Sequence, residues 1–221
     1  AMDLGARYLN RHKVLGFVTS SRGLESAQVQ NISSLEKLEI EADVVLNATG
    51  AWAGEITALA GISLQMLYSK GTLLVAHDRL TRRVINRLRP PSDGDILVPG
   101  ATVSIMGTTS VQLPDLKDIR PTRAEARQIM QQGAAMLPDL VKARFTRAYA
   151  GVRPLLKFDH AAHGRAISRG FALIDHDCDG LDNFLTVTGG KLSTFRLMAE
   201  KAADLATQKL GLSTACKTRT E

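Results

Sequence analysis

The sequence has few of the residues that mark secreted, metal-binding or membrane-spanning proteins. It has only two cysteines, Cys178 and Cys216, and because they lack metal-ligand spacing we expect free thiols in a reducing compartment. Aromatic residues make up 5%, too few for a surface on which bases would stack. No apolar run approaches the roughly 20 residues of a membrane-spanning helix, and the first residues do not resemble a secretory signal.

The charge of the chain favours an anionic partner. The net charge is +6, yet the basic residues are scattered apart from Arg82, Arg83, Arg87 and Arg89. Without a basic stripe and aromatic residues, nucleic acid is disfavoured, whereas an anionic small substrate or anionic lipid fits the charge. The acidic run 175–179 indicates a solvated turn and no metal site, because adjacent side chains on extended backbone point in opposite directions.

The predicted elements fall into three stretches. The chain opens in a helix-like segment to about Arg11 without a cap, which suggests a piece of a longer protein. The first stretch then has strands predicted over 14–20, 27–33, 37–40 and 44–47, and a helix near Trp52. The middle stretch has antiparallel strands predicted over 64–68, 72–77, 95–99, 102–108 and 145–150.

A helix in the middle stretch opens at a capping box, Thr122 with Glu125, and is predicted to reach about Leu137. The last stretch has strands predicted over 167–175 and 184–188. A long helix follows and ends at Gly211, with an apolar stripe that begins at Leu192 and Phe195.

This order predicts an α+β protein. Buried, parallel-type strands near both ends of the chain form one α/β domain, and an antiparallel sheet with one helix is inserted between them. The expected boundaries are 1–63 with 158–211 for the discontinuous domain, 64–157 for the inserted domain, and 212–221 for a tail.

Two strand–glycine–helix turns are candidate ligand sites. The first, over 44–52, places Thr49 and Gly50 where a buried strand ends and a helix begins, so that backbone approaches a ligand closely. A plain turn is the alternative. The second, over 188–194, adds Lys191 and hydroxyl groups to the first helical turn, which suits a negatively charged or electron-rich group. A capped helix with a surface lysine is the alternative there.

Two arginines are candidates for binding an anion. Arg153 stands between a glycine-valine pair and Pro154, in stiff backbone that suits bidentate capture of a carboxylate or phosphate. Arg169 follows in the segment ISRG. For either arginine, a surface salt bridge is the alternative.

Taken in order, these segments resemble FAD-dependent glycerol-3-phosphate dehydrogenases of the D-amino-acid-oxidase superfamily, with the greatest similarity to the large subunit of the anaerobic bacterial enzyme. The segments that carry the resemblance are VVLNATGAWAGEI, SKGTLLVAH, ILVPGATVSIMGTTSVQ, AYAGVRPLL, ISRGFALIDHD and LTVTGGKLSTFRLMAEKAAD. The resemblance runs from about residue 5 to residue 211.

The resemblance implies a glutathione-reductase-like FAD domain, incomplete here, with an antiparallel substrate domain. It implies flavin-dependent oxidation of sn-glycerol 3-phosphate to dihydroxyacetone phosphate, with electrons passed to quinone or a partner subunit. It also implies a cytoplasmic protein attached peripherally to the inner membrane. By the same resemblance Arg153 and Arg169 bind substrate, and FAD is bound by Thr49, Gly50, Gly190, Lys191, Leu192 and Ser193.

The sequence departs from the family pattern in two ways. Aerobic relatives carry a histidine where Leu73 stands, so no catalytic base is assigned. Four histidines are candidate bases, and a surface or loop role is the expected alternative for each: His77, His160, His163 and His176. No G-x-G-x-x-G occurs in the 221 residues, so the loop that grips the FAD pyrophosphate is expected upstream. We therefore expect this chain alone to be inactive.

Other functions remain open at this point. Another superfamily oxidoreductase acting on an amino or hydroxy acid would also use two arginines, because they suit a carboxylate. A binding module without redox chemistry is favoured by the missing glycine-rich loop.

Overall fold

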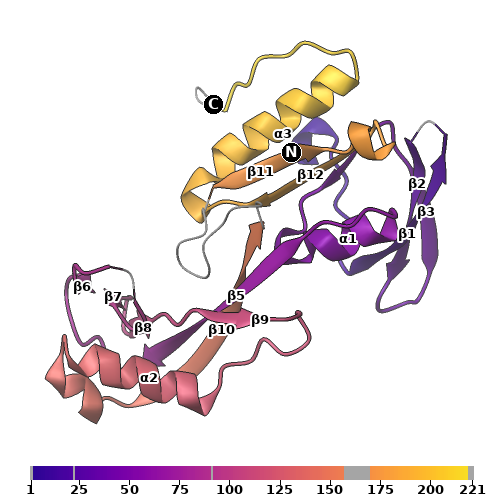
Figure 1. Cartoon of the computed structure of the whole chain (residues 1–221). Coiled ribbons are helices and arrows are strands. Elements are labelled where there is room, and N and C mark those ends of the chain that lie inside the picture. Colours follow the sequence, from indigo (N-terminus) through magenta and orange to yellow (C-terminus); the bar gives the residue numbers. More distant parts are fainter. Residues whose placement is uncertain (1, 22, 91, 157–169, 219–221) are drawn as a thin grey trace. The chain divides into compact units, whose positions relative to one another are not determined.

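In this computed structural model, the structure describes residues 2–21, 23–90, 92–156 and 170–218. The chain divides into two compact units, coloured along the sequence in Figure 1. The discontinuous unit comprises Ala1–Gln65 and Arg169–Glu221, and the inserted unit comprises Met66–Ser168.

The discontinuous unit contains two small sheets. One is an antiparallel meander of β1 (His12–Ser20), β2 (Gly23–Asn31) and β3 (Lys37–Glu41). In the other, β12 (Phe184–Gly189) lies between β11 (Phe171–Asp175), which is antiparallel to it, and β4 (Val45–Asn47), which is parallel to it. Residues 184–188 of β12 are all buried, as expected of a strand covered on both faces. Buried strands of parallel type were predicted near both ends of the chain, and the structure shows that β4 and β12 pair with each other in parallel.

Short helices follow the strands of this unit. After β4 come η2 (Gly50–Trp52) and α1 (Ala53–Leu59), and after β12 come η6 (Leu192–Thr194) and α3 (Phe195–Lys209). The remaining short turns are η1 (Met2–Leu4) and η5 (Asp177–Asp179). Helix α3 contacts β11 and β12 and runs beside them in Figure 1.

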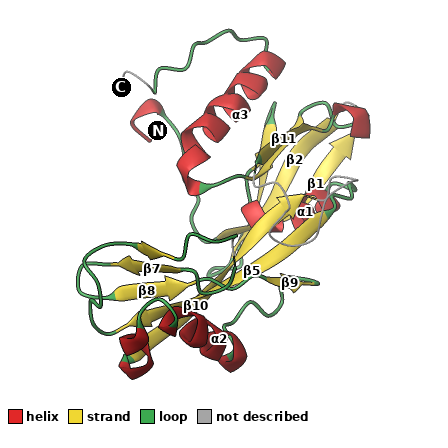
Figure 2. Cartoon of the chain, turned by 60° about the vertical axis from the view of Figure 1, so that its left-hand side comes forward, coloured by secondary structure: helices red, strands yellow, loops and turns green. Residues whose placement is uncertain are grey.

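The inserted unit is built on a six-stranded antiparallel sheet in the order β10-β5-β8-β7-β6, with β9 also paired to β5. Its strands are β5 (Met66–Ala76), β6 (Ile85–Asn86), β7 (Ile96–Pro99), β8 (Ser104–Gly107), β9 (Val111–Leu113) and β10 (Phe145–Leu156). Helix α2 (Arg123–Ala134) and η3 (Pro138–Lys142) lie on one face of this sheet (Figure 2). Between them is a core of Leu74, Leu97, Met106, Ile129 and Leu140.

Four expectations about element limits were wrong. The start is not a helix to Arg11, because only Met2–Leu4 form a short turn. The strands predicted over 64–68 and 72–77 are one strand, β5, since Gly71 pairs with Gly151 without interrupting the ladder. Helix α2 ends at Ala134, short of residue 137, and β10 continues past residue 150 to Leu156.

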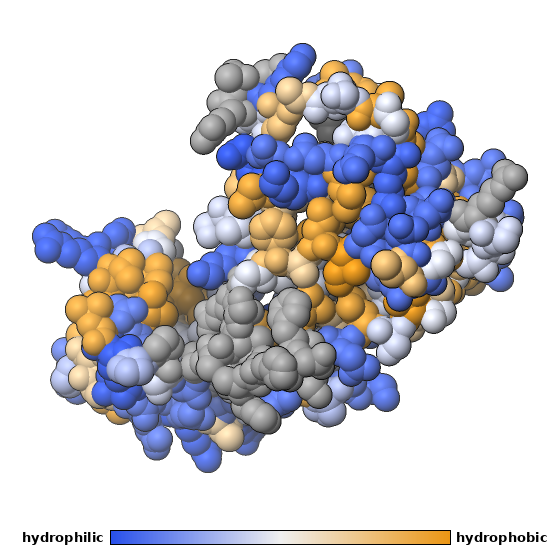
Figure 3. All heavy atoms as spheres, turned by 45° about the horizontal axis from the view of Figure 1, so that its top comes forward, coloured by the Kyte–Doolittle hydropathy of each residue, from blue (hydrophilic) through white to orange (hydrophobic). Residues whose placement is uncertain are grey.

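The apolar stripe predicted for the last helix is also only partly buried. Helix α3 begins at Phe195, which is 66% exposed, and Leu192 before it is 90% exposed. Apolar side chains reach the surface in both units, where they appear orange in Figure 3. Among the described residues, no helix is long and apolar enough to cross a membrane.

Candidate functional site

The turn after β4 is held by the side chain of Asn47, which is buried. Its Nδ2 donates to the carbonyl of Ala53 at 3.0 Å, and its Oδ1 accepts from the hydroxyl of Thr49 at 2.6 Å. Gly50 has a φ of +61°, and its carbonyl accepts from the hydroxyl of Thr188 on β12 at 3.1 Å. The predicted cofactor residues Thr49 and Gly50 are thus fixed by groups from two neighbouring strands.

A chain of polar contacts continues from Asn47 to the surface. Asn47 Nδ2 also donates to Thr186 Oγ1 at 3.3 Å, and Thr186 Oγ1 lies 2.9 Å from His176 Nε2. His176 Nδ1 lies 2.7 Å from Asp179 Oδ2, and the ring stacks on Phe184. His176 lies in the loop between β11 and η5 and is 1% exposed, so a surface position was wrong for this histidine. No local pattern predicted its burial, because the ring is covered by packing against Phe184 and Thr186 of β12.

The turn after β12 requires glycine for two reasons. Gly190 has a φ of +76°, and a Cβ added there would come within 2.6 Å of Met198 Sδ. Its N–H donates to the carbonyl of Gly170 at 3.1 Å. Lys191 follows with an exposed side chain, and its N–H donates to the hydroxyl of Thr194 at 3.1 Å. The backbone at the start of η6 is therefore fixed while the ammonium remains accessible.

An apolar cavity of about 600 Å³ lies between this turn, α3 and the end of β4. Three predicted cofactor residues line it: Gly190, Lys191 and Leu192. The other three do not: Thr49, Gly50 and Ser193. The remaining lining is mostly alanine and larger apolar side chains, with Leu46 from β4 and Ala48 directly after it. The structure therefore brings three of the six predicted cofactor residues together at one cavity.

The inserted unit holds Arg153 on β10. Its Nη1 donates to Ser69 Oγ and to the carbonyl of Thr109, both at 3.4 Å, and its Nη2 donates to Thr108 Oγ1 at 3.2 Å. The guanidinium lies directly over Gly71, since a Cβ added to Gly71 would come within 2.5 Å of Arg153 Nη2. Arg153 is half-buried, and several oxygen atoms fix the direction of its fork.

The other candidate residues were Arg169, Leu73 and the histidines. Arg169, His160 and His163 lie outside the described residues. Leu73 lies against Gly107 in the inserted unit, and the exposed His77 is 3.6 Å from the carboxylate of Asp78. No base is therefore assigned among the histidines of the described ranges.

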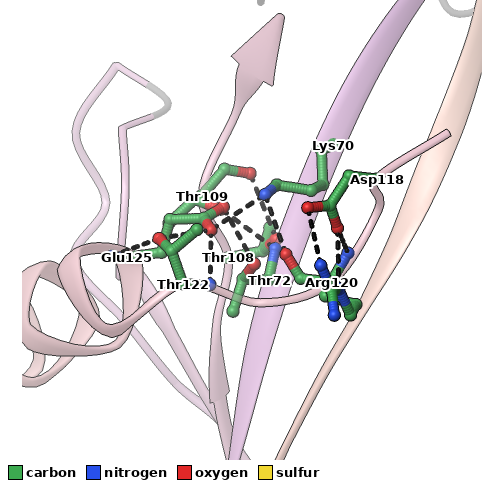
Figure 4. A network of polar contacts seen from close by, with 8 residues as sticks. All are labelled: Lys70, Thr72, Thr108, Thr109, Asp118, Arg120, Thr122 and Glu125. Carbon is green, nitrogen blue, oxygen red and sulfur yellow. Dashed lines mark hydrogen bonds and ion pairs between the residues drawn. The ribbon is translucent and has the colours of Figure 1, made fainter. Parts of the chain in front are cut away.

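Sequence reasoning missed a buried ion pair in the inserted unit. Lys70 Nζ lies 3.0 Å from Glu125 Oε2, and both side chains are less than a tenth exposed (Figure 4). Burial alone would raise the pKa of Glu125, but donors from Lys70, Thr122 and Thr72 outweigh it and lower the pKa from 4.5 to about 2. The sequence predicted that Thr122 and Glu125 form the capping box of α2, and that prediction is confirmed. No sequence pattern predicted that Lys70 would be buried or paired with Glu125.

Potential metal ligands do not gather in the described part of the chain. Within it, no group of histidine, cysteine, aspartate and glutamate could hold a metal ion. Cys178 and Cys216 are free and exposed.

Comparison with known proteins supports a flavoprotein. The chain is 42% identical over 221 residues to one subunit of the anaerobic glycerol-3-phosphate dehydrogenase of Escherichia coli K12, and 39% identical to the subunit of the same name from Haemophilus influenzae. Both matches cover 99% of this chain, which spans 41% of the first relative and 39% of the second.

Solved structures share the fold. The glycerol-3-phosphate dehydrogenase of Bacillus halodurans, solved with FAD, has a TM-score of 0.76 at 25% identity, over 95% of this chain and 41% of that one. The L-proline dehydrogenase of P. horikoshii has a TM-score of 0.65 at 22% identity, over 96% of this chain and 53% of that one. A sequence model described as FAD dependent oxidoreductase matches residues 1–205. The chain therefore belongs to the family of FAD-dependent oxidoreductases.

Proposed function

We propose that this chain is part of a flavoenzyme that oxidises sn-glycerol 3-phosphate to dihydroxyacetone phosphate. The observation that carries the proposal is the guanidinium of Arg153, held by oxygen atoms over Gly71 in the inserted unit. A phosphate dianion suits a forked, permanently charged donor of fixed direction. The names of the relatives give the substrate to which this chemistry corresponds.

The role of Arg153 is to bind and orient the phosphate group. We propose Arg169 as the second cation, because a dianion is bound best by paired positive groups. Bound in this way, the phosphate fixes the position of the carbon to be oxidised, and orientation of that kind lowers the barrier of the chemical step.

The cofactor is proposed to be FAD, which supplies the acceptor for hydride when it is bound. Gly190, Lys191 and Leu192 line the apolar cavity that fits its ring system, and Thr49, Gly50 and Ser193 would contact other parts of it. Lys191 would stabilise the negative charge that the flavin gains on reduction. The glycine-rich loop for the pyrophosphate is not among the 221 residues, so the complete protein is needed for binding.

The partner and location remain proposals of the same kind. Each of these relatives is named as one subunit of its enzyme, which supports a partner subunit here. We propose that electrons pass to quinone through that partner, and that the enzyme works on the cytoplasmic side of the inner membrane as a peripheral protein.

The proposal is tested by replacing or displacing the guanidinium of Arg153 in the complete protein. Arg153→Lys should raise the KM for glycerol 3-phosphate about 30- to 100-fold, because an ammonium cannot reproduce the bidentate fork. Gly71→Ala should raise KM in the same direction, since its methyl group would occupy the place of Arg153 Nη2. The control is Gly151→Ala, which lies opposite Gly71 in the β5–β10 ladder and whose added Cβ meets nothing within 4 Å.

Unchanged kinetics in both Arg153→Lys and Gly71→Ala would refute the phosphate role of Arg153. Turnover of an amino or hydroxy acid in preference to glycerol 3-phosphate would instead favour the other superfamily activity.

A further inference from the structure

Glu125 accepts more hydrogen bonds than a helix cap needs. Its Oε2 accepts from the N–H and hydroxyl of Thr122, at 2.9 and 2.8 Å, which completes the capping box of α2. The same oxygen is 3.0 Å from Lys70 Nζ. Its Oε1 accepts from the hydroxyls of Thr72 at 2.9 Å and Thr109 at 3.2 Å. One carboxylate therefore ties the first turn of α2 to the sheet (Figure 4).

The stability of α2 does not by itself account for these contacts. A capping box needs the carboxylate and the N-cap residue only. A buried ion pair contributes little net stability, because removing both charges from water costs about as much as their attraction returns. The other residues that Glu125 contacts lie on β5 and in the segment after β8. These contacts therefore fix the position of that segment relative to β5.

Thr109 connects this carboxylate to Arg153. Its hydroxyl donates to Glu125 Oε1 and accepts from the N–H of Thr72 at 2.9 Å, so both bonds fix its side chain. Its carbonyl accepts from Arg153 Nη1 at 3.4 Å, and the neighbouring Thr108 hydroxyl accepts from Nη2 at 3.2 Å. Thr109 is completely buried, so a change at its hydroxyl is transmitted to its carbonyl.

We propose that Glu125 is a positioning residue for Arg153 and acts through Thr109. Lys70 neutralises the carboxylate, and the groups that Thr108 and Thr109 present to the guanidinium are neutral oxygen atoms. These contacts thus hold the guanidinium in a fixed direction through neutral oxygen atoms. This inference rests on the proposed function, in which Arg153 binds the phosphate of the substrate.

The test uses Thr109→Val and Glu125→Gln in the complete flavoenzyme. Thr109→Val removes the hydroxyl that bonds Glu125 and leaves the carbonyl that faces Arg153. We expect KM for glycerol 3-phosphate to rise about tenfold, the size of effect of one lost hydrogen bond, with kcat within about twofold and the flavin spectrum unchanged. Glu125→Gln should raise KM similarly, and Thr109→Ser, which restores the hydroxyl, should return KM close to wild type.

A matched control separates positioning from general loss of stability. Ser104 is a fully buried hydroxyl in the same unit that accepts from the N–H of Leu80 and lies outside the network. Ser104→Ala should lower the melting temperature about as much as Thr109→Val and leave KM unchanged. Equal KM increases in the two variants would overturn the inference.

A double mutant separates this inference from the proposed function. In the Arg153→Lys background, Thr109→Val should add almost nothing to KM, because the group that it positions is gone. If Arg153→Lys raises KM while Thr109→Val and Glu125→Gln do not, the positioning role is wrong and the phosphate role stands. If Arg153→Lys has no effect, the proposed function itself fails.

Discussion

At the scale of single residues, the charge of Lys191 should be measurable in the chemistry of the cofactor. It follows two glycines at the end of β12 and lines the apolar cavity. Its side chain is exposed, so the alternative of a plain surface lysine also agrees with the geometry. The two roles differ in whether the ammonium interacts more strongly with the reduced flavin than with the oxidised flavin.

Lys191→Met in the complete protein should retain FAD and lower the flavin midpoint potential by tens of millivolts. The reason is that the lost cation stabilises the reduced, negatively charged form, and ~30 mV corresponds to about 1.4 kcal/mol for a two-electron couple. A spectroelectrochemical titration measures the midpoint potential of each protein. Lys201→Met is the control, since Lys201 lies on α3 and pairs with Asp204 at 3.6 Å. Equal potentials in all three proteins would make Lys191 a surface residue.

At the scale of elements, the Glu125 carboxylate fastens α2 to β5. The folded-state pKa of Glu125 is lowered from 4.5 to about 2, so its contribution to stability is fully present above about pH 4.5. That contribution is lost progressively as the pH falls from about 4.5 to about 2. A shift of this size corresponds to about 3 kcal/mol between the ionised and protonated forms.

Glu125→Gln should therefore lower the free energy of unfolding at neutral pH, by up to about 3 kcal/mol, and by progressively less as the pH falls below about 4.5. Urea unfolding of both proteins across this range measures the difference. Asp118, whose pKa is also lowered to about 2, is present in both proteins and cancels in the comparison. A difference that does not change with pH would show that the charge of Glu125 contributes nothing.

For the whole molecule, the prediction concerns the cofactor. The 221-residue chain by itself is expected to be colourless and inactive, because its turns do not replace the backbone N–H groups of a glycine-rich pyrophosphate loop. The absorption spectrum of the purified chain tests whether it binds flavin. A band near ~450 nm from bound flavin would contradict the expectation.

Part of the architecture was readable from local patterns. The continuous apolar run at 44–46 and the glycines after residue 188 predicted two strands of one α/β sheet, and β4 and β12 do pair in parallel. The capping box at Thr122 located the start of α2. The division predicted between 64–68 and 72–77 was wrong: Gly71 lies inside one strand, where a glycine lets another group come close, and here that group is Arg153.

The sequence by itself determined the family, the order of the elements and the residue types at the two glycine turns, because each depends on a contiguous motif. The roles of Arg153, Arg169 and the cofactor residues stay predictions. Only the tertiary structure decided that Lys70 meets Glu125, that Thr109 lies between Glu125 and Arg153, and that His176 is buried against Thr186. These contacts join residues far apart in the chain, and the pairing of strands and the packing of α2 on its sheet bring them together. The spacing of these residues along the sequence does not indicate that they are in contact.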